Sequence, residues 1–368
     1  MKILIFSWKD IKTPFAGGAE VYTYEICKRL VAKGHNITLL TPKFKDCIDC
    51  EIIDGIKILR YGGRYSLYFK AKNYYKKYLQ VENFDIVIDQ INTIPFFTPS
   101  YVNNKKIVSL IYQLAREFWF HEIKFPFNFI GYYFFEKACL KKYSRFPSIT
   151  ISESTKSDLK ELNFKNLNIV PIGINSASLY NEEIKINNRE IILTYLGRLT
   201  KTKKTLDILK AFKIVNKQFR ETKLSLIGDG YLKKYLIKYA TSLDCADNII
   251  FHGFLEEYEK FQILNKSKLL LVSGIREGWG IVVTEANSVG VPAIGYNIHG
   301  LRDSIIDGGT GLLCEPNPEG MAKKIIKFLE DKNLQDTLSK NALKYSRNFS
   351  WDKSAEEFEK VLESICNV

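Results

Sequence analysis

The chain has 368 residues and a mass of 42.5 kDa, which corresponds to two or three domains. Apolar residues make up 46% and charged residues 26%, a composition that excludes a disordered or fibrous chain. The net charge is +13, and residues 1–180 hold 26 basic against 16 acidic side chains, compared with 28 against 25 in the rest. This basic first half points to an acidic partner: nucleic acid, an anionic membrane surface or a phosphorylated substrate.

Short β-branched runs alternate with helical patterns along the first half. We expect helices over 18–33 and from an N-cap at Ser152 to Leu162. Strands are expected at 2–6, 36–40, 57–61, 85–89, 106–110, 148–151 and 168–171. The polar segment 175–189 lacks periodicity and is expected to be a linker.

The alternation then starts again. Strands are expected at 191–196, 223–227, 248–251, 269–272 and 291–295, with helices that begin near Lys203, Gly230, Glu256, Gly280, Pro318 and Trp351. Strands that alternate with helices of this length favour parallel sheets with right-handed crossovers. The sequence therefore predicts an α/β protein with two Rossmann-like domains facing one another across a cleft.

Cysteines and hydropathy indicate where such a chain works. Cys47 and Cys50 form one CxxC pair, but no second pair lies at zinc-ligand spacing, so we expect free thiols in a reducing cytosol. The apolar start of the chain is too short for a signal peptide. The longest apolar stretch, 125–135, falls short of the roughly 18 to 20 residues of a membrane-spanning helix. We therefore expect no membrane span.

Two glycine-rich or basic turns are candidates for phosphate binding. Small residues at 16–20 (AGGAE) let backbone amides at a helix N-terminus approach a phosphate, although a plain tight turn would need the same residues. Arg198 and Lys203 follow a buried strand, at the end where open α/β sheets bind ligands. Together they can clamp a diphosphate, and the alternative is a solvated basic loop.

The segment 276–285 (REGWGIVVTE) combines two carboxylates with a glycine-rich loop. Glu277 should lie in the loop and Glu285 in the helix that follows. Amides of residues 280–282 would be free to donate to a phosphate or sugar, and the carboxylates can accept bonds from sugar hydroxyls. Surface helix charges alone would not need Gly278 and Gly280.

With these motifs the chain resembles a family 4 retaining glycosyltransferase of the GT-B fold over nearly all of its length. The residues that carry the resemblance are GGAE at 17–20, SEST at 152–155, PIGIN at 171–175, GRL at 197–199 with Lys203, GDG at 228–230, HG at 252–253, Glu277 with Glu285, GGTGLL at 308–313 and FSW at 349–351. The resemblance implies an acceptor-binding domain at 1–180 and a domain at 181–348 that binds a UDP or GDP sugar. A final helix at 349–368 would cross back to the first domain.

The family pattern also implies roles for single residues. Arg198 and Lys203 would neutralise the donor diphosphate, helped by amides of Gly17 and Gly18. Glu285 would bind the ribose, and Glu277 the transferred sugar. The remaining donor-site positions would be Gly228, Asp229, His252, Gly253, Gly278, Trp279, Gly280, Ile281 and Val282, with the base near His252 and Gly253. The chain contains no DxD pair, so we expect no metal and no cofactor beyond the donor.

Three positions depart from the family pattern. Lys204 stands where glycine is common after the lysine, and Asp303 stands where glutamate is usual. Tyr112, on the acceptor side with Arg116, aligns with a position that commonly holds histidine. A phenol would then replace the histidine contact near the acceptor hydroxyl.

Two stretches of the first half mix aromatic and basic residues. Residues 60–80 hold seven aromatic and six basic side chains without an acidic one, and 116–146 hold twelve aromatics. This composition suits a membrane interface, while the alternative is a core of aromatics under a solvated basic face. No nucleic-acid-binding motif accompanies it.

These observations together predict a retaining, metal-independent hexosyltransferase. It would move a hexose from a nucleotide diphosphate sugar to a glycan or lipid-linked acceptor at the cytoplasmic face of the membrane. Two alternatives stay open at this point. One is a sugar-nucleotide epimerase or phosphorylase with a similar two-domain cleft. The other is a pseudoenzyme that binds nucleotide sugar, which Tyr112 would permit.

Overall fold

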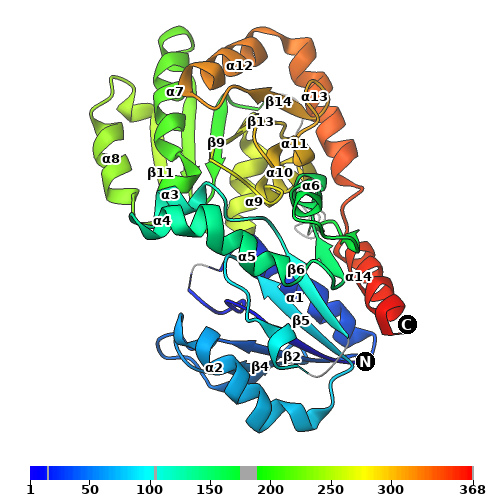
Figure 1. The fold of residues 1–368 in the computed structure, drawn as a ribbon. Coiled ribbons are helices and arrows are strands. Elements are labelled where there is room, and N and C mark those ends of the chain that lie inside the picture. The colour runs from blue at the N-terminus through cyan, green and yellow to red at the C-terminus, as the bar shows by residue number, and fades with distance from the viewer. Residues whose placement is uncertain (15, 103–105, 175–188, 367–368) are drawn as a thin grey trace. The chain divides into compact units, whose positions relative to one another are not determined.

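The computed structural model describes residues 1–14, 16–102, 106–174 and 189–366. The chain forms two compact units, and Figure 1 labels their elements. The first consists of Met1–Trp119, Phe125–Gly173 and Ser350–Val368, and the second of Phe120–Lys124 and Ile174–Phe349. The expected boundary at residue 180 and most of the expected linker lie outside the described residues.

The first unit contains an eight-stranded sheet in the order β3-β4-β2-β1-β5-β6-β7-β8, parallel except where β3 meets β4. Its strands are β1 (Lys2–Phe6), β2 (Asn36–Thr41), β3 (Cys50–Ile53), β4 (Ile56–Arg60), β5 (Ile86–Ile91), β6 (Ile107–Ile111), β7 (Ser148–Thr150) and β8 (Leu167–Ile169). Successive side chains of β1 point to opposite faces, so Leu4 and Phe6 join one core cluster with residues of α2.

The helices of the first unit are α1 (Gly18–Ala32), α2 (Ser66–Tyr74), α4 (Phe127–Ile130), α5 (Glu136–Lys141), α6 (Glu153–Glu161) and α14 (Trp351–Cys366). α3 (Phe118–Glu122) lies where the chain passes from the first unit into the segment Phe120–Lys124 of the second. α2 continues as a π-helical turn over Tyr75–Leu79, and a second π-helical turn, Gly131–Phe135, precedes α5. Ser152 caps α6 as expected, because its side chain accepts from the amide of Thr155.

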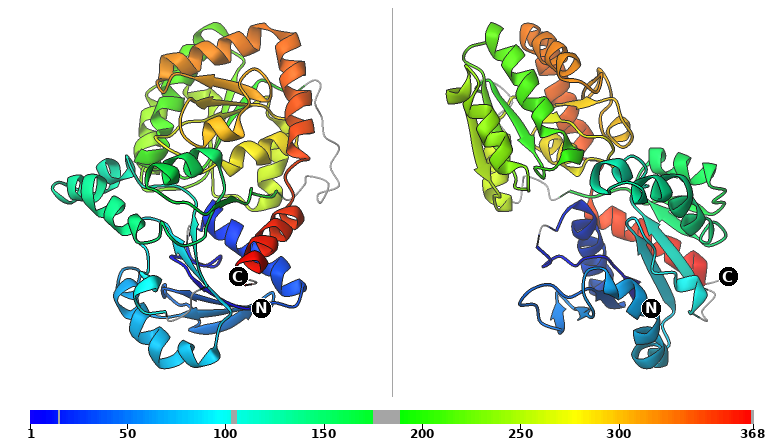
Figure 2. Two further views of the ribbon diagram at one scale, coloured as in Figure 1. Left: turned by 45° about the vertical axis from the view of Figure 1, so that its right-hand side comes forward. Right: turned by 60° about the vertical axis from the view of Figure 1, so that its left-hand side comes forward.

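The last helix, α14, packs against α1, as both views of Figure 2 show. Trp351 is buried and its ring meets Tyr22 edge-on at 5.9 Å. Arg29 pairs with Asp352, and Lys33 with Glu359. These contacts make the end of the chain part of the first unit.

The second unit contains a six-stranded parallel sheet in the order β11-β10-β9-β12-β13-β14. Its strands are β9 (Ile192–Leu196), β10 (Lys223–Ile227), β11 (Ile249–Gly253), β12 (Leu269–Val272), β13 (Ala293–Tyr296) and β14 (Gly311–Cys314). Its helices are α7 (Thr205–Gln218), α8 (Lys233–Thr241), α9 (Glu257–Lys266), α10 (Ile281–Ser288), α11 (Leu301–Ser304), α12 (Pro318–Glu330) and α13 (Lys332–Ser346).

One core cluster of this unit joins α7, α8 and α12 to the sheet, and another joins α9, α10 and α11 to β12 and β13. Helices therefore lie on both faces of the sheet, and the loops that leave its carboxyl ends stay exposed to ligands. The predicted α/β class with two parallel-sheet domains is confirmed. No helix in the described ranges is both long and apolar enough to cross a bilayer.

The strands expected from the sequence are all present within one or two residues of the expected bounds. Those not expected are β3 and β14, and the unexpected helices include α2 and α13. β3 and β4 form a hairpin whose two turn residues, Asp54 and Gly55, have φ values of +45° and +79°. An Asp-Gly pair between apolar runs is a sequence signal for this hairpin, so β3 could have been predicted.

Candidate active site

The loop after β9 carries the two candidate phosphate-binding cations. The amide of Gly197 donates to the carbonyl of Ile227 at 3.0 Å, and that of Leu199 to Asp229 at 2.9 Å, which ties the loop to the end of β10. Arg198, between them, is exposed, and no side chain in the described parts of the chain pairs with its guanidinium. Lys203 ends a 3₁₀ turn just before α7.

Lys203 forms an ion pair with Glu277, the candidate sugar-binding carboxylate. The distance from Nζ to Oε1 is 2.5 Å, and the two side chains are 21% and 12% exposed. Because β9 lies between β10 and β12, the pair sits where the strand order of the sheet reverses. Open α/β sheets bind their ligands at this point. The fold thus brings together two residues that lie 74 positions apart.

Backbone contacts hold the two loops in place around this pair. The Ser273 hydroxyl donates to the carbonyl of Lys203 at 2.6 Å, and the amide of Ile275 donates to Thr202 at 3.0 Å. A Cβ atom on Gly300 would lie 2.2 Å from the carbonyl oxygen of Glu277, and Gly300 has φ +79°. Only glycine allows this approach. Neither the bond from Ser273 to Lys203 nor the close approach of Gly300 to Glu277 has a signal in the sequence, because both form only where separate loops meet.

Helix α10 begins directly after the loop that carries Glu277. Gly280 is its N-cap with φ +86°, and Ile281 and Val282 begin the helix, where amides have no acceptor within the helix. Trp279, which follows Gly278, is buried. Its indole donates to the Thr284 hydroxyl at 2.9 Å. Its ring also meets Phe349 edge-on. The Trp279 side chain therefore packs inside the unit.

Glu285 lies in the second turn of α10 and is also paired. Its Oε1 is 2.7 Å from Nζ of Lys260 on α9, and both side chains are mostly buried. Lys260 had no sequence signal as a site residue, since its nearest partner in the chain is 25 positions away. The pair fixes one carboxylate oxygen of Glu285 and leaves the other for a ligand.

The ends of β10 and β11 complete this side of the sheet. Gly228 donates to the carbonyl of Gly253 at 2.7 Å, and a Cβ atom on it would lie 2.0 Å from Gly197. Lys233 bonds to Asp229 and lowers the pKa of that carboxyl. Burial lowers the pKa of His252, so its imidazole is neutral near pH 7.

Gly17 and Gly18 begin α1 in the first unit. The amide of Gly17 donates to Oε2 of Glu20 at 2.6 Å, which is the half of a capping box that a glycine N-cap can form. Gly17 is the N-cap and Gly18 the first helical residue. The Gly17 amide is therefore already engaged by a side chain of its own helix, whereas a role in donor binding was expected for it.

Tyr112 follows β6 and its side chain is buried. The phenol donates to the carbonyl of Ala19 at 3.1 Å and lies 2.7 Å from the Thr23 hydroxyl, while the Gln90 amide donates to it at 3.4 Å. Burial raises its pKa well above the ordinary value. The phenol links β6 to the first turn of α1, so its bonds are made within the unit.

Arg116, the other expected acceptor-side residue, has φ +42°. Its amide donates to Glu136 at 3.0 Å, and its guanidinium lies 3.9 Å from the carboxylate of Glu161. Burial raises the pKa of Glu136. The ion pair with Glu161 is thus long, and its acidic partner is 70% exposed.

Comparison with known proteins identifies the family to which this chain belongs. Residues 178–345 match the family of glycosyl transferases group 1, and residues 16–178 match glycosyltransferase family 4. The chain belongs to these glycosyltransferases. An uncharacterized glycosyltransferase of Methanocaldococcus jannaschii is 26% identical, with 99% of each chain covered. The resemblance stated from the sequence is confirmed.

Solved structures share the fold of this glycosyltransferase. Sucrose-phosphate synthase from Thermosynechococcus elongatus aligns with a TM-score of 0.82 and 18% identity, over 99% of this chain and 98% of its own. HepE from Anabaena, solved in complex with UDP and glucose, aligns with a TM-score of 0.72 and 16% identity over 99% and 100%. At these identities the likeness establishes the fold alone.

Lys204 stands where the family commonly has glycine, and its backbone conformation leads to a prediction about stability. It is the N-cap of α7 with φ +49° and ψ +37°, a left-handed conformation that glycine adopts without strain. Its Nζ lies 5.6 Å from the Tyr296 ring centroid. We expect Lys204→Gly to raise the free energy of unfolding by about 1 kcal/mol, or Tm by about 2 to 4 °C, measured by thermal unfolding.

The matched control is Lys204→Ala. It removes the same charge and the contact with Tyr296 but keeps the strained backbone, so it should give no gain. Equal stability of the glycine and alanine variants would show that backbone strain at residue 204 is not significant.

Proposed function

We propose that this glycosyltransferase transfers a hexose, with retention, from a nucleotide diphosphate sugar to a glycan or lipid-linked acceptor at the cytoplasmic face of the membrane. The observation that carries the proposal is the Lys203–Glu277 pair at the strand-order reversal, with the unpaired Arg198 on the same loop. HepE, which shares the fold, has been solved with UDP and glucose, which supports a nucleotide sugar as donor.

The chemistry needs stabilisation of a leaving diphosphate. As the bond between the sugar anomeric carbon and the diphosphate oxygen breaks, negative charge grows on the diphosphate. Arg198 presents an unpaired guanidinium, and Lys203 presents an ammonium group whose position is fixed by Glu277. Preorganised cations of this kind are worth most where charge develops in the transition state. The amides at the start of α10 add a partial positive charge.

Glu277 has a second function in this proposal. Its Oε1 binds Lys203, so Oε2 remains to accept a hydroxyl of the transferred sugar. Glu285, bound to Lys260 by one oxygen, would hold the ribose with the other. The acceptor hydroxyl attacks the anomeric carbon on the face from which the diphosphate leaves, and its proton passes to the departing diphosphate oxygen. We assign no nucleophile, because both glutamates are engaged as ligands and ion-pair partners.

A second candidate function is donor binding without transfer. It is favoured by Tyr112, whose phenol makes its bonds inside the first unit at the position where the family resemblance gives histidine. An epimerase or phosphorylase of the same fold differs from both, since an epimerase needs no acceptor and a phosphorylase consumes phosphate.

The deciding experiment combines donor binding with product analysis. A thermal-shift panel of UDP and GDP sugars identifies the donor, because a bound ligand raises Tm. That donor is then incubated with and without membrane lipid extract or glycan acceptors, in the presence of EDTA. We expect acceptor-dependent transfer of the sugar that survives chelation, since Arg198 and Lys203 supply the positive charge. Activity that EDTA abolishes would overturn the metal-independent mechanism, and donor binding without product would favour the pseudoenzyme.

Single substitutions test the diphosphate clamp. Arg198→Ala should lower kcat by about 10² to 10³, or roughly 2 to 4 kcal/mol, with a smaller rise in donor KM, because the contact strengthens as the bond breaks. Lys203→Ala should lower kcat similarly and also raise donor KM, since it leaves Glu277 without its partner beside the diphosphate.

Lys204→Ala is the matched control for both clamp variants. It removes the neighbouring cation, which lies over the Tyr296 ring and pairs with no carboxylate among the residues that the structure describes. It should change kcat only slightly. Similar small effects of all three substitutions would show that this loop is a solvated basic surface and not a diphosphate-binding site.

Two exposed surfaces of the chain support a membrane location. On α2 and the turn after it, Lys70, Lys72, Lys76 and Lys77 are exposed and pair with no acidic side chain in the described ranges. Between 120 and 134 the large apolar side chains are exposed, among them Phe125 at 80%, Phe127 at 69% and Phe134 at 64%. Solvent-exposed aromatics and unpaired lysines suit an anionic lipid surface.

Vesicle co-sedimentation tests the two surfaces separately at near-physiological ionic strength. We expect binding to anionic vesicles and little to neutral ones. Changing Lys70, Lys72, Lys76 and Lys77 to Gln should weaken binding and its salt dependence, at about 1 kcal/mol per lysine near the lipid. Changing Phe125, Phe127 and Phe134 to Ser should weaken it without altering the salt dependence.

The matched control for charge changes Lys323, Lys327, Lys340 and Lys344 to Gln. These lysines are exposed on α12 and α13, and their substitution removes the same net charge from the second unit. The control should bind vesicles as the wild type does. Equal loss in the control would reduce the effect to overall charge, and a wild type that does not sediment would leave a soluble glycan as the better acceptor.

A further inference from the structure

Aromatic side chains gather around one arginine at the carboxyl end of β1. Trp8 follows β1, and its ring lies 5.9 Å from Tyr65 and 5.8 Å from Tyr68. The guanidinium of Arg64 lies 5.0 Å from the Trp8 ring centroid and 5.5 Å from that of Tyr65. We call Trp8, Arg64, Tyr65 and Tyr68 the aromatic platform.

The platform lies at the strand-order reversal of the first sheet. β1 has β2 on one side and β5 on the other, so the reversal falls between β1 and β5. Tyr68 stacks on Phe96, in the loop after β5, with ring centroids 4.5 Å apart and an interplanar angle of 20°. Trp8 therefore lies in the loop after β1, and Tyr68 contacts the loop after β5, at the reversal where a sheet of this kind binds its ligand.

Arg64 lies exposed at the surface of the first unit. Arg64 and Tyr65 are exposed, Trp8 and Tyr68 are partly buried, and no acidic side chain in the described parts of the chain pairs with the guanidinium. Its position over two rings holds the guanidinium in place. Such a group binds phosphate or carboxylate strongly, and the ring faces offer an apolar surface to a sugar.

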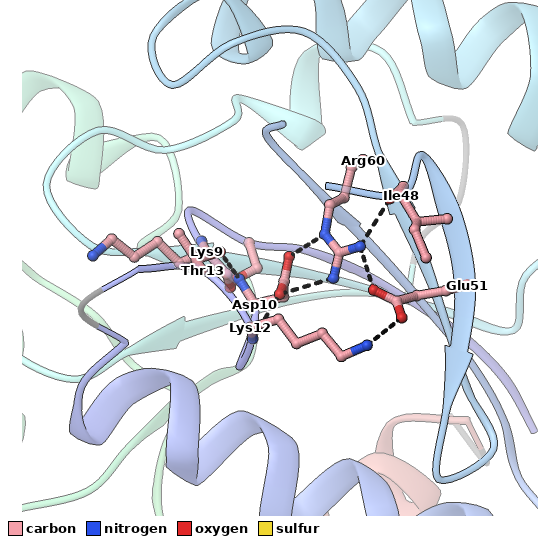
Figure 3. Close-up of polar contacts among 8 residues, drawn as sticks. Lys9, Asp10, Lys12, Thr13, Ile48, Glu51 and Arg60 are labelled. Carbon is pink, nitrogen blue, oxygen red and sulfur yellow. Dashed lines mark hydrogen bonds and ion pairs between the residues drawn. The ribbon is translucent and has the colours of Figure 1, made fainter. Parts of the chain in front are cut away.

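A buried ionic network holds the loop that carries Trp8 (Figure 3). Arg60 at the end of β4 binds both oxygens of Asp10, from Nε to Oδ2 at 2.7 Å and from Nη2 to Oδ1 at 3.0 Å, and both side chains are fully buried. Arg60 also binds Glu51, which pairs with Lys12. Two cations and two carboxylates balance, so this network fixes the loop and needs no ligand.

We infer that the aromatic platform binds an acceptor in which a sugar ring carries an anionic group, either a phosphate or a carboxylate. The sugar face stacks on Trp8, Tyr65 and Tyr68, and the anion binds Arg64. The inference rests on the proposed function in one respect, that the first unit holds the acceptor. It narrows that acceptor from any glycan or lipid-linked sugar to an acidic one.

The test uses the fluorescence of Trp8, one of four tryptophans in the chain. The full-length protein is titrated without vesicles with glucose 1-phosphate, glucuronate, glucose or inorganic phosphate. We expect saturable quenching by the two acidic sugars with a Kd at least tenfold below those of glucose and of inorganic phosphate. The Trp8→Phe variant should lose the signal. A preference between the acidic sugars identifies a phosphate or a carboxylate as the anion.

Arg64→Gln should raise the Kd for the acidic sugars about tenfold, to the value for glucose. The matched control is Arg145→Gln, since Arg145 is an exposed arginine of the same unit that lies 5.9 Å from a single ring, Phe146. It should leave the Kd unchanged. Equal effects of the two substitutions, equal binding of glucose and acidic sugars, or inorganic phosphate binding as tightly as glucose 1-phosphate would each overturn the inference.

Donor binding is measured in parallel, so that the inference and the proposed function fail separately. Arg64→Gln should leave the thermal shift by the nucleotide sugar unchanged, and Arg198→Ala should leave the quenching by acidic sugars unchanged. A wild type that binds acidic sugars at Trp8 but no nucleotide sugar would overturn the proposed function. Quenching that disappears in Arg198→Ala would place the acidic sugar at the donor loop and overturn the platform.

Discussion

The pair formed by Lys203 and Glu277 constrains the whole candidate donor site. Both side chains are largely removed from water, so each needs the other to avoid an uncompensated buried charge. The pair requires the loops after β9 and β12 to meet. Once they meet, Ser273 binds the backbone of the β9 loop and Gly300 brings the β13 loop against Glu277. The position of Arg198 and the start of α10 follow from these contacts.

The same logic separates cations that hold the protein together from cations that are available to ligands. Arg60, Lys203 and Lys260 are each bound to a carboxylate and are mostly buried. Arg198 and Arg64 are exposed and have no carboxylate partner in the described ranges. A sequence cannot make this distinction, because Asp10 is 50 positions from Arg60 and Glu277 is 74 from Lys203. The +13 net charge therefore says less about ligands than the few unpaired arginines do.

Much of the fold could be predicted because a buried parallel strand has a local signal, a short β-branched run followed by a helical period. β14 (GLLC) contains no β-branched residue and α13 is largely polar, so neither has a strong signal of its own. Helix α2 was not expected, because the basic and aromatic residues at 60–80 were interpreted as a surface patch and not as a helical pattern. In fact Tyr75 is buried in the core while Tyr65 and Phe69 are exposed, so the run contributes side chains to both the core and the surface.

The candidate site was predictable where residues lie next to glycine-rich turns and unpredictable where function depends on what the side chain touches. Gly228 follows β10 directly, Glu277 lies in the loop after β12, and Gly280 lies at the start of α10, as expected. Tyr112 also lies at a strand end, but its phenol binds Ala19 and Thr23 and ties β6 to α1. Its position in the sequence predicted a contact with the acceptor. In the structure the hydroxyl is buried, and its bonds hold elements of the first unit together.

This use of Tyr112 bears on where an acceptor could bind in the first unit. A hydroxyl already bonded to Ala19 and Thr23 is a poor partner for a substrate, because a new bond would have to replace one that is buried. An exposed arginine with aromatic neighbours lies instead at the ends of β1 and β4, where Arg64 lies over the ring of Trp8. The rule that places the donor loops of the second sheet at the reversal between β9 and β12 then also applies to the first sheet, between β1 and β5. Both binding surfaces would follow from the same topology, with different side chains selecting a diphosphate in one and an acidic sugar in the other.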